Sequence, residues 1–165
     1  MKKIIAVLVV MISLQGCTTD NGLVVNNNTI SEVFEIKNVN FGYDPIDGYA
    51  IYQKFTLAIY PSDVVLIYRL SGTIDSSTPI WQLIPRTLFV VQGELDYDYD
   101  FSKEYFTIYA GGNYDLALTP SYLNNQTFRI VIVPGAFSSN LKTSNYEDVM
   151  AGLNINESQI QTVSF

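Results

Sequence analysis

Hydrophobic and polar residues alternate with a period of two along most of the chain, which is the pattern of strands that bury one face. Turn residues separate β-branched and aromatic runs at spacings near ten, which predicts several short strands. The apolar side changes early in this region, because Phe34 and Ile36 share one face whereas Val39 and Phe41 share the other. We therefore expect a β-bulge near Asn38, since one extra residue exchanges the two faces of a strand.

Two runs are apolar on both faces, as is typical of strands that a second layer covers. They are Val64–Leu70 and Gln126–Val133, and we expect both near the centre of a sheet. Turn residues at Ser71-Gly72 and Gly111-Gly112 are expected to end the strands before them. Shorter alternating segments predict the other strands, at residues 51–60, 80–84, 87–91, 93–101 and 104–110.

The pattern changes to that of a helix near the end of the chain. Ser144 and Glu147 form a capping box, and Val149, Met150 and Leu153 follow at helical spacing. Seven or eight short strands with one short C-terminal helix favour an all-β fold, an immunoglobulin-like antiparallel β-sandwich. A small β-barrel is the structural alternative, but prolines divide the chain into strands that are short for a barrel.

The first seventeen residues have the pattern of a targeting segment. Lys2 and Lys3 precede the apolar run Ile4–Leu14, which is shorter than the roughly 20 apolar residues that span a bilayer. The segment then ends in Gln15-Gly16-Cys17, which resembles the lipobox of bacterial lipoproteins and contains the only cysteine of the chain. We expect residues 1–16 to be a lipoprotein signal peptide and Cys17 to be lipidated. An ordinary signal peptide with an incidental cysteine is the alternative.

A lipid on Cys17 would anchor the protein to a membrane of the cell envelope. Each buried acyl methylene contributes about 0.8 kcal/mol, so two or three chains hold a protein stably on a membrane. The asparagine-rich residues 17–31 would form a flexible tether of roughly 20 Å, although Leu23–Val25 is an alternative first edge strand. Residues 32–165 would form a single β-sandwich domain, held at the outer membrane on its periplasmic or exposed side.

The charge of the chain excludes one class of partner. The formal net charge is −7, with 9 basic and 16 acidic residues, and loss of Lys2 and Lys3 would make it more negative. Binding to nucleic acid or to anionic lipid head groups requires clusters of Lys and Arg. We therefore expect no nucleic-acid partner, and membrane contact only through the lipid.

The chain contains no histidine, which excludes Ser-His and Cys-His nucleophile systems and the usual zinc sites. We predict no catalytic residues and no cofactor, and carboxylate chemistry is what remains. Residues 93–101, GELDYDYDF, place Asp96, Asp98 and Asp100 at the spacing of an EF-hand loop. The likeness stops there, because Phe101 stands where Gly makes the turn and Thr107 where the bidentate Glu should be.

Three interpretations of this acidic segment stay open. The first is the solvated face of a strand, because Leu95, Tyr97, Tyr99 and Phe101 alternate with the acids. The second is a calcium site at Asp96, Asp98 and Asp100, completed by Asp44, Asp47 or Asp115. The third is the acid pair of a glycan hydrolase, which needs two carboxyl groups across a cleft, one of them in dry surroundings.

Tyrosine is abundant, with 12 copies in the chain. Tyrosine is favoured at binding surfaces, because it offers a large area and a hydroxyl group at little entropic cost. The other explanation for this abundance is that most of the tyrosines are half-buried at strand edges.

Several stretches resemble a group of small, uncharacterised envelope lipoproteins of Bacteroidota, especially flavobacteria. The resemblance extends from about Glu32 to Leu153 and is carried by the motifs DVVLIYRLSGTID, PIWQLIPRTL, GELDYDYDFSKEYFTIYAGGNYDLALTP and NQTFRIVIVPG. Some members have a Gly-Pro-rich, collagen-like stretch after the lipid cysteine. This chain differs, because Thr18–Ser31 contains only Gly22 and no proline. The resemblance implies an envelope lipoprotein with a β-rich domain and supplies no catalytic residues.

The sequence thus favours a membrane-anchored envelope lipoprotein whose β-sandwich has a structural or binding role and is not an enzyme. A calcium-dependent module that binds a ligand or glycan is the alternative, and a carboxylate-based glycan hydrolase is a weaker one. No feature of the sequence identifies a protein or glycan partner.

Overall fold

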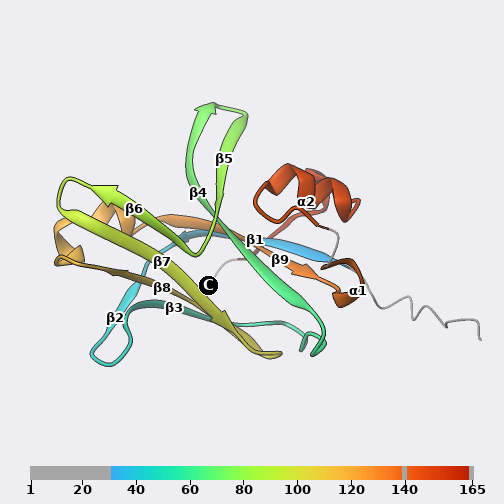
Figure 1. Ribbon diagram of the computed structural model, residues 1–165, viewed down its shortest axis with the longest axis horizontal. Coiled ribbons are helices and arrows are strands. Elements are labelled where there is room, and N and C mark those ends of the chain that lie inside the picture. Colours follow the sequence, from blue (N-terminus) through green and yellow to red (C-terminus); the bar gives the residue numbers. More distant parts are fainter. Residues whose placement is uncertain (1–30, 139–140, 164–165) are drawn as a thin grey trace, which may run out of the picture.

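The computed structural model describes residues 31–138 and 141–163. Two five-stranded sheets pack face to face, and one short helix lies against the outer face of one sheet (Figure 1). The predicted all-β sandwich is therefore confirmed, and two separate sheets with edge strands exclude the small-barrel alternative. The predicted signal peptide, Cys17 and the tether up to residue 30 lie outside the described residues.

Sheet A has the strand order β10-β1-β9-β4-β5. β9 lies at its centre and β4 beside it, as the two apolar runs predicted. Four of the five strands pair antiparallel, whereas β10 runs parallel to β1. The bounds are β1 Glu32–Val39, β4 Val64–Asp75, β5 Thr78–Leu83, β9 Gln126–Val133 and β10 Gln161–Val163.

Sheet B has the order β2-β3-β8-β7-β6, and all its pairs are antiparallel. Its bounds are β2 Gly42–Asp44, β3 Gly48–Lys54, β6 Arg86–Val90, β7 Gly93–Phe101 and β8 Tyr105–Gly112. The described residues therefore form ten strands instead of seven or eight. The strands that were not predicted include β2 and β10. Each has three residues, which is too short to show an alternating pattern.

The short helices follow β8 and β9 in the chain. The α-helices are α1 Gly135–Ser138 and α2 Tyr146–Gly152, and the 3-10 turns are η1 Leu116–Leu118, η2 Pro120–Tyr122 and η3 Glu157–Gln159. The predicted C-terminal helix is α2, but its N-cap is Asn145 and not Ser144. The Asn145 side chain accepts a hydrogen bond from the backbone N–H of Asp148, so the capping-box prediction placed the helix start one residue too early.

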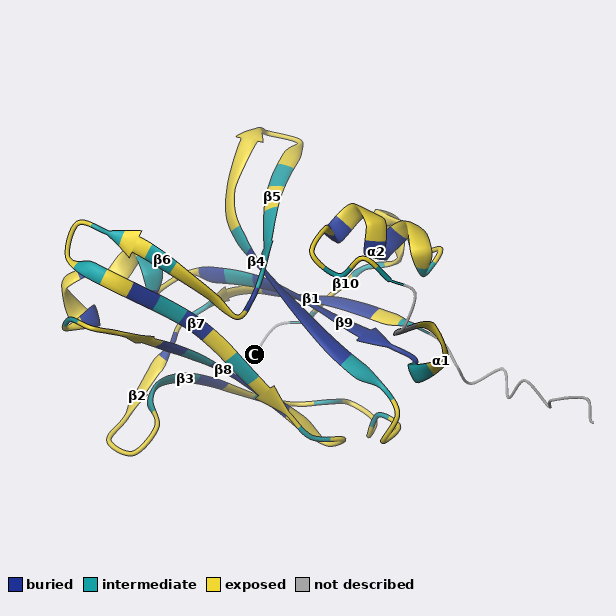
Figure 2. Ribbon diagram, in the orientation of Figure 1, coloured by how far each residue is buried: buried dark blue, intermediate teal, exposed yellow. Residues whose placement is uncertain are grey.

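Two hydrophobic clusters lie on the two faces of sheet A. Ile67 and Ile130 point between the sheets and are fully buried there. Their neighbours Tyr68 and Val131 point to the other face, where they pack under α2. Figure 2 shows the result as buried segments along β4 and β9, in contrast to mostly exposed tips of the β4–β5 hairpin. Sheet A is therefore covered on both faces, which explains why its central strands are apolar throughout.

The predicted bulge in β1 is confirmed. The register between β1 and β9 shifts between Ile36 and Val39, and Asn38 has a positive φ of 56°. Asparagine tolerates this left-handed conformation better than most residues. As a result, Phe34 and Ile36 precede the shift and Phe41 follows it, and all three point into the core between the sheets.

Only the first part of the predicted strand at residues 51–60 is a strand. β3 ends at Lys54, and the chain then binds the β7–β8 turn through Phe55 N–H to Glu104 O and Ile59 N–H to Lys103 O. Phe55 and Ile59 still pack against the core, whereas Leu57 is 81% exposed. Alternation alone did not reveal the loss of sheet pairing, because these side chains bury their apolar surface outside a ladder.

Two predicted strand ends are also wrong. β4 continues past Ser71-Gly72 to Asp75, with register shifts against β5 on both sides of Gly72 and Thr73. This continuation makes the β4–β5 hairpin that projects from the sandwich beside α2 (Figure 1). Gly111 and Gly112 remain paired with Asp96 and Leu95, and Gly112 fits there because a side chain would collide with the backbone of Glu94 in β7.

The one-residue difference at the start of α2 gives a direct test. Asn145→Ala should lower the free energy of unfolding by about 1 kcal/mol, because the amide of Asp148 loses its acceptor. The matched change Ser144→Ala should cost less than about 0.5 kcal/mol, as is usual at exposed positions. Urea unfolding can be followed by the fluorescence of the single tryptophan, Trp81, which lies next to Tyr146 of α2. Equal losses for the two variants would contradict this assignment of the cap.

Candidate functional site

The acidic segment forms β7, and its carboxylates lie on the outer face of sheet B. Leu95 and Tyr97 point into the core and are almost fully buried, whereas Asp98 and Asp100 are exposed and Asp96 is half-buried. The first interpretation of the segment, the solvated face of a strand, is therefore confirmed.

Tyrosines from β3 and β8 lie beside these acids. The register places Asp98 opposite Tyr109, and the hydroxyl group of Tyr109 donates to Asp100 Oδ2 at 2.9 Å. Tyr52 of β3 contacts Tyr105 of β8, with ring centroids 5.2 Å apart. These five residues form the surface that we name the tyrosine–aspartate face.

The carboxylates of Asp98 and Asp100 on this face are solvent-accessible. The ion pairs within the described part of the chain involve only Glu35, Lys37, Arg129 and Glu157, so none neutralises Asp98 or Asp100. Burial, together with the bond to Asp100, raises the pKa of Tyr109, which keeps its hydroxyl group a donor. The face thus presents unpaired carboxylates beside partly exposed aromatic rings.

The structure does not gather the acids around one point. No group of three or more Asp, Glu, His or Cys side chains within residues 31–138 and 141–163 is placed to hold a metal ion. Asp44 instead accepts from the backbone of the β2–β3 turn, and Asp115 caps η1. Carboxylates at alternate positions of an extended strand form a row, roughly 7 Å apart, whereas calcium needs oxygens on several sides. The calcium site at Asp96, Asp98 and Asp100 stays a prediction.

Calcium binding can be tested by thermal unfolding of the full chain in detergent, with millimolar calcium or with a chelator. We expect the same midpoint in both, because a row of carboxylates provides no cage for the ion. An ion that binds only the folded state raises the midpoint as its concentration increases. A rise that depends on calcium, and that is lost in Asp98→Asn/Asp100→Asn, would therefore establish the calcium site.

The second candidate is a buried arginine that the sequence reasoning did not select. Arg129 lies in the middle of β9, on the face of sheet A that α2 covers, and is 7% exposed. A buried charge needs close partners, since removing it from water costs several kcal/mol. Three side chains supply them: Glu35, Tyr146 and Glu157.

The guanidinium group of Arg129 is bound on two sides. Its Nε donates to Glu35 Oε2 at 2.9 Å, from the neighbouring strand β1. Its two terminal nitrogens donate to the two carboxylate oxygens of Glu157, each at 2.7 Å, and one also donates to Tyr146 Oη at 2.5 Å. Burial alone would lower the pKa of Arg129, but the bonds to Glu157 and Glu35 raise it above its usual value. The arginine is therefore permanently charged.

Aromatic rings complete these surroundings. The guanidinium carbon lies 4.2 Å from the ring centroid of Trp81 and 5.0 Å from that of Tyr146, both within cation–π range. Burial raises the pKa of Tyr146 to about 12, although the charge of Arg129 opposes this. The indole Nε1 of Trp81 is buried without a hydrogen-bond partner, which is unusual for a polar group.

An open cavity of about 450 Å³ lies against this arginine. The β4–β5 hairpin, α2, η3 and β9 all contribute to its wall, which consists of Ser77, Thr78, Pro79, Trp81, Arg129, Tyr146, Glu147 and Glu157. It is within the usual size range of small-molecule sites. The sequence contained one signal for it, a charged residue within the apolar run of β9, but the partners of Arg129 lie 94, 17 and 28 residues away.

A second buried arginine, Arg69, serves the core between the sheets. Its Nε donates to Gln126 Oε1 at 2.9 Å, and its guanidinium carbon lies 4.7 Å from the ring centroid of Tyr97. Burial raises the pKa of Tyr97 to about 12, and its hydroxyl group donates to the backbone of Tyr122. These contacts close one end of the sandwich.

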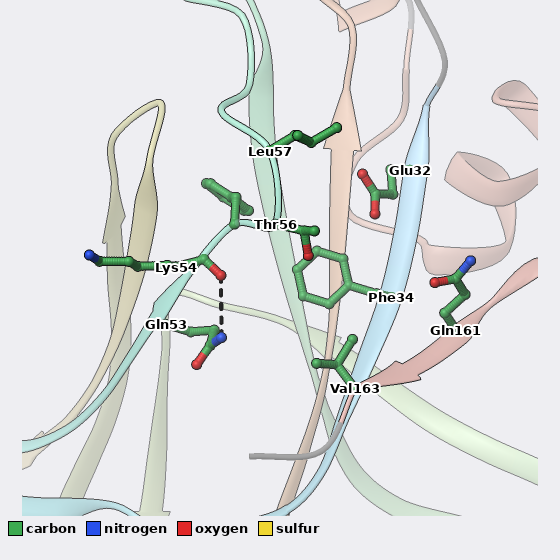
Figure 3. A pocket seen from close by; sticks show the side chains of 9 residues that line it. Glu32, Phe34, Gln53, Lys54, Thr56, Leu57, Gln161 and Val163 are labelled. Carbon is green, nitrogen blue, oxygen red and sulfur yellow. Dashed lines mark hydrogen bonds between the residues drawn. The ribbon is translucent and has the colours of Figure 1, made fainter.

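A further hollow lies at the open edge between the sheets. Figure 3 shows Phe34 and Val163 of sheet A opposite Gln53 and Thr56, with Leu57 above them. Its volume is about 60 Å³, which accommodates little more than solvent. It is a small gap between β1, β10 and the end of β3.

Comparisons with known proteins do not assign the chain to a family. A scan of protein-family models finds no match, and neither a search of curated proteins nor a search of solved structures finds one. Among residues 31–138 and 141–163, no helix is long and apolar enough to cross a membrane.

Proposed function

We propose that this protein is a lipid-anchored lipoprotein of the bacterial envelope that binds a basic protein segment through its tyrosine–aspartate face. The observation that carries the proposal is the uncovered outer face of sheet B, where Asp98 and Asp100 have no basic partner and adjoin Tyr52 and Tyr105. The role is binding and not catalysis.

The lipobox supports the anchor. Cys17 is the only cysteine, and it follows a small residue at the end of an apolar run, where lipoprotein processing requires it. About 14 residues lie between Cys17 and β1 in the sequence.

The chemistry of the face supports a cationic partner. The chain is acidic overall, with a formal charge of −7, so its field attracts basic molecules. Arginine side chains form ion pairs with carboxylates and stack on tyrosine rings, and the face offers both groups side by side. A neutral glycan would use the rings but would gain little from the charge.

The cavity at Arg129 holds two acids, Glu147 and Glu157, and therefore bears on the glycan-hydrolase alternative. Both oxygens of Glu157 bind Arg129, and its side chain is 66% exposed. A general acid needs dry surroundings, and Glu157 is exposed to solvent. This arrangement favours binding over hydrolysis.

Lipidation is tested by growing cells with labelled palmitate. The wild-type protein and the matched variant Thr18→Ala should incorporate the label, whereas Cys17→Ala should not, because it has no thiol to modify. Mass spectrometry of the purified proteins should show acyl chains only where Cys17 is present. Label in Cys17→Ala would contradict the anchor.

Partner chemistry is tested with a hexa-arginine peptide and calorimetry on the full chain in detergent. Asp98→Asn/Asp100→Asn should weaken binding roughly 5- to 20-fold, because each exposed ion pair contributes up to about 1 kcal/mol. Asparagine keeps an oxygen that can accept the bond from Tyr109, so the face retains its shape.

The control Glu147→Gln/Asp148→Asn changes the net charge equally at helix α2, on the far side of the sandwich. It should alter the affinity less than about twofold. Equal weakening by both double variants would mean that only the long-range field attracts the peptide, and the proposed face would be withdrawn.

A further inference from the structure

The Arg129 cavity lies on the far side of the sandwich from the tyrosine–aspartate face, and the proposed function does not use it. Its wall comes mainly from β5 and α2, and the β4–β5 hairpin projects from the sandwich beside α2 (Figure 1). A charged and hydrogen-bonded group thus lines an open cavity without an assigned role.

We propose that this cavity binds a small carboxylate that carries a ring, with the carboxylate on Arg129 in the place that Glu157 now occupies. The proposal is independent of the partner of sheet B, so failure of either leaves the other standing.

The two carboxylates on Arg129 differ in how firmly they are held. Glu35 lies in β1, directly opposite Arg129 in the ladder, is 5% exposed and also binds Lys37 at 2.8 Å. Glu157 lies in η3, a turn of three residues, and its side chain is 66% exposed. Glu35 is therefore the permanent counterion, and Glu157 is the exchangeable one.

Exchange of Glu157 for a ligand carboxylate preserves the bonding of the arginine. A planar guanidinium presents two parallel N–H groups that match the two oxygens of a carboxylate. The ligand would accept the two bonds that Glu157 now accepts, while Glu35 and Tyr146 stay in place. Arg129 thus stays charge-paired throughout, and no buried charge is left alone.

The remaining walls favour a ring on the ligand. Trp81, Tyr146 and Pro79 provide flat apolar surfaces beside the guanidinium, in a cavity of about 450 Å³. A ring next to the ligand carboxylate would pack on these surfaces while the carboxylate binds Arg129.

The charge balance favours a carboxylate over a phosphate. Arg129 is the only cationic side chain among the eight that line the cavity, and Glu35 already neutralises part of its charge. Glu147 adds a negative charge to the wall. A dianion would be repelled more strongly than a monoanion here.

The test is a titration of the 15N-labelled full chain in detergent micelles with benzoate, and with the uncharged isostere benzamide. Trp81 is the only tryptophan, so its indole N–H gives a single NMR signal at the site. Benzoate should shift this signal saturably, whereas benzamide should not. Glu157→Gln should bind benzoate at least about tenfold tighter than the wild type, because the internal competitor loses its charge.

Glu147→Gln is the comparison variant, since it removes the same charge from the same cavity but no bond to Arg129; it should therefore tighten benzoate binding by less than about threefold. If Glu157→Gln does not fold, Glu157→Asp keeps the charge but shortens the reach, and should tighten binding by a smaller factor. No saturable shift in any variant, or equal effects of Glu157→Gln and Glu147→Gln, would overturn the proposal and leave Glu157 as a fixed clamp.

Discussion

The charge of Arg129, buried at the centre of sheet A, determines much of how this chain folds. Its partners come from β1, from α2 and from η3, which are far apart in the sequence. Tyr146 and Glu157 reach this charge because the chain that follows β9 folds back over sheet A. This path explains why β10 returns to the edge of β1, since it continues directly from η3.

Because the C-terminal residues cover sheet A, the outer face of sheet B stays open. The helix and the C-terminal turns lie on sheet A, so Tyr68 and Val149 bury their apolar surface there. Sheet B has one buried face, and its outer face bears the acids of β7 and the tyrosines of β3 and β8. The asymmetry of the sandwich thus separates a neutralised arginine on one side from unpaired carboxylates on the other.

Local alternation revealed most of the sandwich, because strand formation depends on neighbouring residues. The bulge at Asn38 and the run of β9 were predicted for this reason, and β9 has the predicted bounds. Sequence patterns did not show which strands pair or which tyrosines gather, since register decides both. The Arg129 site also escaped prediction, because Glu157 carries no local signal for a contact 28 residues away.

Stability alone does not account for the Arg129 cluster. Replacing a buried ion pair by apolar residues of similar volume is often neutral, or stabilising by about 1–4 kcal/mol. A leucine on β9 would pack against Trp81 and Tyr146 and would need no counterion. The cluster is therefore explained better by what its exposed half can do. Glu35 is held within the sheet, whereas the second carboxylate lies on a short exposed turn and is the part that the proposed ligand would replace.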